Sequence, residues 1–156
     1  GLDDPIGGIL DDLPAAWRPV TLRQLLTHTS GIPGYTEVAG FFDAPQRRYT
    51  PRELLALVAE QPLKFAPGAR WDYSNTGYYL LGMLVEKLSG KAWDAFLAER
   101  IFRPLGMNRT RANDLEAVLR GRAAGYGGSP RGVVNVPMVH PTQPGAAGAL
   151  VSTARD

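Results

Sequence analysis

The stretch that decides the fold lies between residues 73 and 90, which read YSNTGYYLLGMLVEKLSG. From Asn75 to Ser89, apolar side chains cover most of the circumference of a helix, and Gly90 follows as a C-terminal cap. The pattern therefore predicts a central helix over 75–89 that packs against other elements on several sides.

Two shorter helices are predicted on the N-terminal side of this stretch. Thr21 followed by Gln24 has the spacing of a capping box at the start of one helix. Thr50, followed by Pro51 and then Glu53, marks the other start more strongly, because proline fits the first position of a helix.

On the C-terminal side, apolar spacing predicts a helix over about 92–102 that stops before Pro104. A short helix is predicted at Asn113, with Glu116 completing a capping box. From 121 to 148 glycine and proline become frequent, which predicts a loop with one or two short strands. The segment is thus expected to be mainly α with short β pieces.

Composition and charge argue against several classes of function. Lys and Arg number 17 against 15 acidic residues, giving a net charge of +2 with no basic run, so no nucleic-acid partner is expected. No apolar stretch reaches the roughly 18 residues that a bilayer span needs, so no membrane span is expected in this segment. The 156 residues contain no Cys and only two distant histidines, so no metal site is expected.

Complete catalytic motifs are missing. None of the serines lies in a G-x-S-x-G elbow, and none is followed by Lys three residues later. There is no H-E-x-x-H motif, phosphate-binding loop or dinucleotide-binding glycine pattern. A self-contained active site is therefore not expected in this chain.

Tyr73 and Asn75 form the one pair with an obvious chemical use. In an extended segment, residues i and i+2 project to the same side, so both side chains can face one cleft. A phenol beside an ammonium can carry a proton, and an amide can orient both the ammonium and a substrate carbonyl. The tripeptide also fits an ordinary helix start, with Ser74 as cap and Tyr73 packing on Tyr78 as a hydrophobic staple.

Four stretches, in this order, resemble motifs of the serine beta-lactamase and penicillin-binding-protein-like hydrolases, in the class C-related branch. They are LLTHTSGIP at 25–33, PGARWDYSNTGY at 67–78, IFRPLGM at 101–107 and GALVSTARD at 148–156. Ala149 departs from the second glycine that is common in the last motif. Each motif is weak alone, but their conjunction covers most of the chain.

The resemblance implies that Tyr73 is the general base or proton shuttle, and that Asn75 is the hydrogen-bonding partner of a lysine and of the substrate. The implied reaction is Ser acylation followed by hydrolysis of an ester, a D-amino-acid peptide or a beta-lactam, with no cofactor. The substrate would be a small molecule or a peptide. His28 would have a scaffold role at the turn 31–33, and Tyr35–Arg48 is a candidate cleft rim.

The resemblance also implies that 1–156 is a single partial domain, the helical region of an α/β fold. The family's S-x-x-K helix would precede Gly1 and a strand of its sheet would follow Asp156, so the segment alone is expected to be inactive and to pack against these missing parts. The alternative is a non-catalytic relative, either one that binds peptidoglycan-like or peptide ligands or a helical interaction domain with no chemistry. An upstream S-x-x-K helix would support the enzyme. Localisation is left open: a periplasmic or exported bacterial protein is as compatible as a cytoplasmic one.

Overall fold

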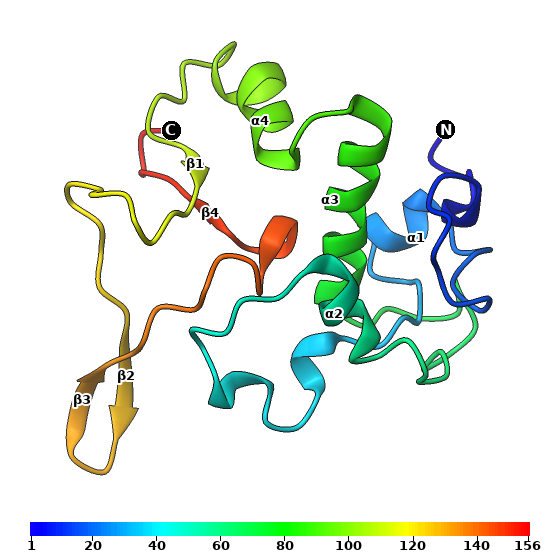
Figure 1. The fold of residues 1–156 in the computed structure, drawn as a ribbon, viewed down its shortest axis with the longest axis horizontal. Helices are drawn as coiled ribbons and strands as arrows, with labels where there is room; N and C mark the ends of the chain where they lie inside the picture. Colours follow the sequence, from blue (N-terminus) through cyan, green and yellow to red (C-terminus); the bar gives the residue numbers. More distant parts are fainter.

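Helix α3 (Asn75–Ser89) forms the axis of the computed structural model, which describes residues 1–156. It has the predicted bounds, and Gly90 ends it in the left-handed conformation with φ of 69°. In Figure 1, α1 and the N-terminal turns lie on one side of α3, and α4 and the C-terminal strands lie on the other. The remaining helices and strands are α1 (Leu22–Leu26), α2 (Pro51–Ala56), α4 (Trp93–Leu97), β1 (Arg111–Ala112), β2 (Tyr126–Ser129), β3 (Gly132–Asn135) and β4 (Leu150–Val151).

The two predicted capping boxes are confirmed. In α1, the Gln24 N–H donates to Thr21 Oγ1 at 3.3 Å, and the Thr21 N–H donates to Gln24 Oε1 at 3.0 Å. In α2, Thr50 and Glu53 exchange the same pair of bonds, and Pro51 occupies the first helical position. These helices have only five and six residues, so tertiary packing must supply most of their stability.

The predicted helix at 92–102 is present, but its hydrogen bonding changes along its length. It begins as α4 and continues as a π-helical turn over Ala98–Phe102. The short helix predicted at Asn113 is absent, and that prediction is wrong. The Asp114 carboxylate accepts the N–H groups of Glu116 and Ala117 at 2.8 and 3.3 Å, which gives the backbone a local alternative to helix.

The strands form two separate antiparallel pairs. β1 pairs with β4, and β2 pairs with β3 as a hairpin that projects from the rest of the molecule in Figure 1. The loop with short strands predicted for 121–148 is therefore present. The description "mainly α" holds only in part, because turns, 3₁₀ turns and loops occupy more of the chain than α-helix does.

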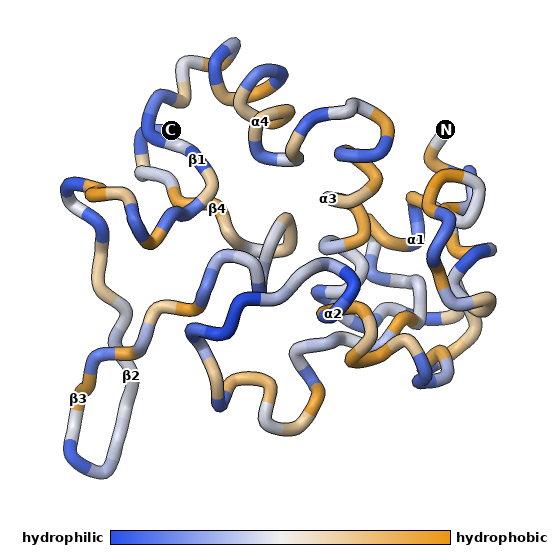
Figure 2. The backbone as a smooth tube through the Cα atoms, viewed as in Figure 1, coloured by the Kyte–Doolittle hydropathy of each residue, from blue (hydrophilic) through white to orange (hydrophobic).

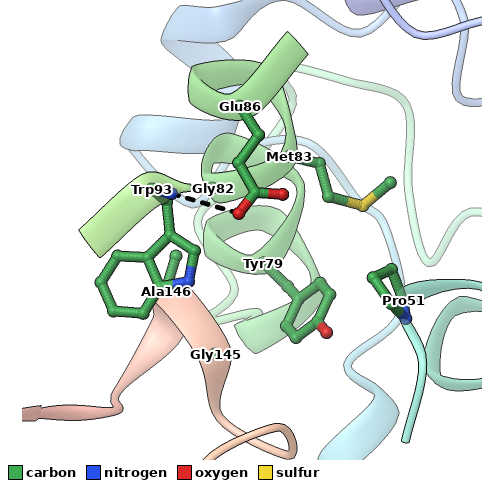
Figure 3. A pocket seen from close by; sticks show the side chains of 8 residues that line it. All are labelled: Pro51, Tyr79, Gly82, Met83, Glu86, Trp93, Gly145 and Ala146. Carbon is green, nitrogen blue, oxygen red and sulfur yellow. Dashed lines mark hydrogen bonds between the residues drawn. The ribbon is translucent and has the colours of Figure 1, made fainter. Parts of the chain in front are cut away.

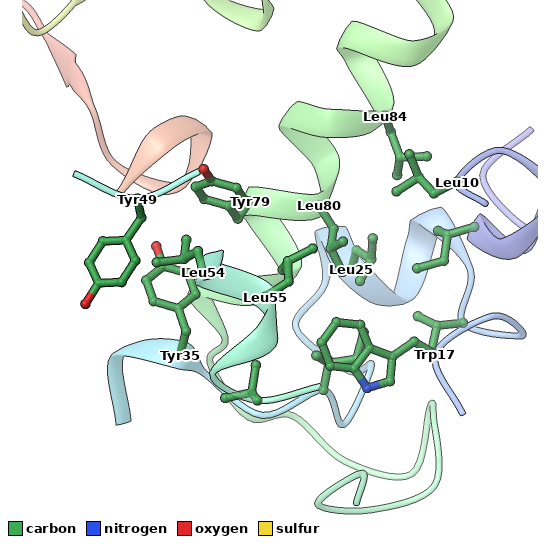
Figure 4. Packing of buried hydrophobic residues seen from close by; sticks show 14 of the residues in the cluster. Leu10, Trp17, Leu25, Tyr35, Tyr49, Leu54, Leu55, Tyr79, Leu80 and Leu84 are labelled. Carbon is green, nitrogen blue, oxygen red and sulfur yellow. The ribbon is translucent and has the colours of Figure 1, made fainter. Parts of the chain in front are cut away.

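The hydrophobic core packs against α3 as far as Leu84 (Figure 4). Leu80 and Leu25 are fully buried where α3 meets α1, and Trp17 closes the core from the N-terminal turns. At the far end of α3, Leu88 is 67% exposed, so the expected burial on several sides applies to the helix only as far as Leu84. The hydropathy colouring of Figure 2 shows the apolar stretches that build this core, in α3 and beside α1.

A glycine allows a second close contact on α3. The 3₁₀ turn Gly145–Ala147 packs onto the helix at Gly82, where a Cβ would lie 2.4 Å from the Cβ of Ala146. A side chain at Gly82 would therefore push this turn away. No helix of the structure combines the length and the apolar character that a bilayer crossing needs.

Candidate active site

Tyr73 and Asn75 meet as the spacing predicted. Ser74 between them is extended, with φ of −142° and ψ of 116°. The Tyr73 hydroxyl donates to Asn75 Oδ1 at 2.9 Å. Tyr73 is 50% exposed, so its phenol is accessible at the surface. The pair thus combines an exposed phenol with an amide oxygen that accepts its hydrogen bond and orients its O–H group.

Thr36 completes this arrangement and was not singled out from the sequence. Asn75 Nδ2 donates to Thr36 Oγ1 at 3.1 Å. Because the Asn75 carbonyl faces Tyr73 and its NH₂ faces Thr36, both ends of the amide are engaged. Thr36 lies 39 residues from Asn75 in the chain, and no local spacing signals the contact.

A buried threonine holds Thr36 within reach of α3. Thr76 is fully buried, and its hydroxyl donates to the Pro33 carbonyl at 2.7 Å and accepts the Tyr35 N–H at 3.0 Å. These two bonds fix the segment 33–36 against the first turn of α3. The position of Thr36 relative to Asn75 therefore depends on hydrogen bonds made inside the protein.

The simple helix-cap interpretation of the tripeptide does not account for Ser74. Ser74 is the residue before α3, but its side chain makes no capping bond. Its hydroxyl is buried and has no hydrogen-bond partner. The expected staple is also replaced, because the His28 ring contacts both aromatic residues, with centroids 4.6 Å from Tyr73 and 4.9 Å from Tyr78.

The first two motifs of the resemblance lie against each other. The Asp72 N–H donates to the His28 carbonyl at 2.9 Å, and the Gly68 N–H donates to the Thr29 carbonyl at 2.7 Å. At Gly31, with φ of 73°, a Cβ would lie 2.3 Å from the Phe65 carbonyl oxygen, so only glycine fits. Stretches separated by about forty residues thus form one scaffold under the Tyr73–Asn75 pair.

An ion-pair network joins the two segments that carry the site. Lys64 Nζ lies 2.7 Å from Glu37 and 2.9 Å from Asp72, the neighbours of Thr36 and Tyr73. Burial alone would lower the pKa of Lys64, but the hydrogen bonds and charges of the two carboxylates outweigh it and raise the pKa. Lys64 is therefore a cation at neutral pH that draws both segments together.

The third and fourth motifs lie elsewhere. The residues just after the third motif contact the fourth: the Arg109 N–H donates to Asp156 at 2.7 Å, and the hydroxyls of Thr110 and Ser152 lie 2.6 Å apart. Ala149, the departure from the family pattern, is 5% exposed and is accommodated beside β1. These motifs supply no group to the Tyr73–Asn75 pair.

The candidate cleft rim at Tyr35–Arg48 is mostly exposed, but hydrogen bonds to Gln143 anchor it near both ends. Tyr35 is fully buried and donates its hydroxyl to the Gln143 carbonyl at 2.7 Å. The Gln143 amide donates in turn to the carbonyls of Ala44, Pro45 and Arg47. Within this segment, Thr36 is the residue that hydrogen-bonds to the pair.

A small cavity of about 80 Å³ lies beside the middle of α3 (Figure 3). Glu86 and Trp93 both line it, and the Glu86 carboxylate accepts the backbone N–H of Trp93 at 3.1 Å. Neither Tyr73 nor Asn75 lines this cavity. It has room for a few water molecules at most, so the candidate active site is the exposed pair and not this small cavity.

Comparison with known proteins identifies the family. The Beta-lactamase family model matches residues 1–156, and the chain belongs to this family. A penicillin-binding protein from Bacillus subtilis is 37% identical over 116 residues, which cover 71% of this chain and 25% of that protein. The chain spans about a quarter of the length of the curated relatives it matches.

Solved structures support the same assignment. A D-stereospecific amidohydrolase from Streptomyces sp. matches with a TM-score of 0.85 and 33% identity over 99% of this chain and 50% of that chain. D-amino acid amidase from Ochrobactrum anthropi SV3, complexed with D-phenylalanine, matches with a TM-score of 0.83 and 31% identity over 99% of this chain and 46% of that chain. The chain therefore has a beta-lactamase/transpeptidase-like fold and belongs to a family of serine hydrolases.

Proposed function

We propose that Tyr73 and Asn75 form one side of the active site of a serine acyl hydrolase, with Tyr73 as proton carrier and Asn75 as the orienting amide. The observation that carries the proposal is the 2.9 Å bond between the exposed phenol and an amide whose other end is held by Thr36. A fixed amide can orient a substrate carbonyl or a lysine without paying an ordering cost at each turnover.

The nucleophile and its lysine would come from an S-x-x-K helix in another part of the complete protein. For this step Tyr73 must be a phenolate, which the ammonium of that lysine would stabilise. As the serine Oγ attacks the substrate carbonyl carbon, its proton passes to the phenolate oxygen of Tyr73. Collapse of the tetrahedral intermediate breaks the bond to the leaving amine or alcohol, which takes that proton. Water then attacks the acyl-serine ester by the same route, releasing the acid and restoring the serine hydroxyl.

Amides of D-amino acids are the substrates we propose first, with beta-lactams and esters as the other candidates. The support is similarity to the amidohydrolase and the amidase above, which cover nearly all of this chain. Because pocket shape sets substrate choice within one fold, the class of substrate needs a direct assay.

The test uses the complete protein and three reagents: fluorescent penicillin, a fluorophosphonate and D-phenylalanine amide, with the L-enantiomer as control. We expect covalent labelling by at least one of the first two, and preferential hydrolysis of the D-amide. Replacement of Tyr73 by Phe should slow both by about 10²- to 10⁴-fold at unchanged folding. Saturable but non-covalent penicillin binding, with no labelling and no turnover, would instead establish the non-catalytic alternative.

A further inference from the structure

His28 has an unusual backbone. It is the one residue other than glycine with a positive φ, 55°. The left-handed conformation is costly for a residue with a Cβ, and it persists where surrounding contacts impose it, often near functional sites. Here the His28 carbonyl accepts the Asp72 N–H at 2.9 Å. The strained peptide is therefore attached to the segment that leads directly into Tyr73.

The His28 ring lies within an aromatic group at the start of α3. Its centroid is 4.6 Å from that of Tyr73, and it stacks on Tyr78 at 4.9 Å with an interplanar angle of 25°. Trp71 meets it edge-on at 6.2 Å. Tyr78 is itself fixed, because its hydroxyl donates to the Leu26 carbonyl at 3.1 Å. Tyr78 and Trp71 thus hold the imidazole in place where it contacts the Tyr73 ring.

The ring also bonds to the residue that follows Tyr73. His28 Nδ1 accepts the Ser74 N–H at 3.3 Å, which requires that Nδ1 carry no proton. Burial lowers the pKa of His28 below its ordinary value, which favours the neutral imidazole at neutral pH. His28 therefore contacts three consecutive residues: Asp72 through its carbonyl, Tyr73 through its ring face and Ser74 through Nδ1.

A role at the neighbouring turn does not explain these contacts. The turn at 31–33 is held by other groups: the Lys64 N–H donates to the Gly31 carbonyl at 2.8 Å, and the Ile32 N–H donates to Ser30 Oγ at 3.3 Å. The His28 imidazole makes its hydrogen bond and its ring contacts with residues 71–78 instead. The contacts of the imidazole therefore indicate a role at Tyr73 and its neighbours in the sequence.

We infer that His28 is a positioning residue, whose neutral imidazole holds the Tyr73 phenol in the direction of Asn75. The inference rests on the proposed function, because the value of that direction is the proton transfer by Tyr73. Loss of the imidazole frees the Tyr73 ring on one face and leaves the Ser74 N–H without its acceptor. A misplacement of about 1 Å at a reacting group can cost about 100-fold in rate.

The test compares His28→Ala with His28→Asn in the complete protein, with His140→Asn as the control at the only other histidine. Asn tolerates the left-handed backbone and offers an oxygen acceptor in place of Nδ1, so it is the conservative variant. We expect His28→Ala to lower the acylation rate constant by about 10- to 100-fold with pre-acylation affinity nearly unchanged. His28→Asn should recover part of this loss, and His140→Asn should match the wild type.

A second readout does not depend on catalysis. In protein labelled with ¹³C at tyrosine Cζ, the Tyr73 resonance, assigned with Tyr73→Phe, should shift on acidification below pH 6.5 as the imidazole protonates. His28→Asn should remove this shift and His140→Asn should keep it. The titratable groups packed on the ring are the phenols of Tyr73 and Tyr78. The Asp72 carboxylate is paired with Lys64.

The possible outcomes distinguish a failure of the proposed function from a failure of the positioning role of His28. Wild-type protein that shows neither labelling nor turnover overturns the proposed function, while the Tyr73 resonance still tests positioning. Active wild-type protein with a folded His28→Ala variant that acylates at the wild-type rate overturns the inference. If His28→Ala does not fold, a Tyr73 resonance that ignores acidification in wild-type protein overturns it equally.

Discussion

The core around α3 and the β2–β3 hairpin both contain apolar side chains, but only the core buries them. Leu80 in α3 is fully buried, whereas Val133 in the hairpin is 78% exposed. The fifteen-residue core cluster lies entirely between Ile6 and Leu84. Burial of apolar area is the main favourable term in folding, so the two regions should contribute very differently to stability. The Tyr73–Asn75 pair sits on the well-packed region.

The sharpest contrast should come from large-to-small substitutions in the complete protein. Leu80→Ala removes a fully buried side chain and should lower the free energy of unfolding by about 2–5 kcal/mol. Val133→Ala should change it by less than about 0.5 kcal/mol, because the site is exposed. Urea unfolding followed by circular dichroism measures both, and similar losses for the two variants would refute the contrast.

Adding a methyl group tests the same contrast in the opposite direction. Gly82→Ala would place a Cβ 2.4 Å from that of Ala146 and should cost about 1–3 kcal/mol, despite the better helix propensity of Ala. At Gly128 in the hairpin nothing lies within 4 Å of an added Cβ, so Gly128→Ala is the matched control. Thermal unfolding should separate them by several degrees; a neutral Gly82→Ala would mean that the Gly145–Ala147 turn moves freely.

Local hydrogen bonds from a side chain to the backbone allow a comparison of smaller effects in the core and in the C-terminal region. Thr50→Ala removes the cap of α2, which packs in the core, and should cost about 1 kcal/mol of global stability. Asp114→Ala removes the acceptor for two N–H groups in the C-terminal region. Its effect should be confined to faster hydrogen exchange at Glu116 and Ala117. A global loss from Asp114→Ala as large as that from Thr50→Ala would show that the C-terminal region unfolds together with the core.

The smallest effect concerns acid pH. Burial lowers the pKa of both His28 and His140 from the ordinary 6.5, and at His140 the Arg48 charge lowers it further. The unfolded chain then binds protons more readily than the folded one, so this contribution to stability is present above pH 6.5 and is lost as the pH falls through the folded pKa values. His28→Asn should reduce the acid loss of global stability, measured as urea midpoints between pH 7 and 5. An unchanged pH dependence would contradict the burial of a neutral His28.

Local rules predicted the parts of the fold that depend on neighbouring residues. The capping box at Thr50, the C-terminal cap at Gly90 and the same-side projection of Tyr73 and Asn75 are all formed within a few residues. The same rules failed at Asn113, where the Asp114 side chain competed with helix for backbone N–H groups.

The long-range parts of the site could not be predicted in this way. Thr36 reaches Asn75 because Thr76 fixes the segment before it, and that contact crosses about forty residues without a periodic signal. His28 likewise reaches Ser74 across 46 residues. The order of the motifs identified the family, but it did not reveal the hydrogen bonds by which distant residues hold the site in place.

The most direct test of the account is the acylation rate constant of the complete protein, measured by stopped-flow with a chromogenic beta-lactam or activated ester. The matched comparison is Tyr73→Phe against Tyr78→Phe, since both tyrosines contact the His28 ring but only Tyr73 donates to Asn75. We predict a loss of about 10²- to 10⁴-fold for Tyr73→Phe and less than about tenfold for Tyr78→Phe. Equal rates in the wild type and Tyr73→Phe would contradict the assignment of Tyr73 as the proton carrier.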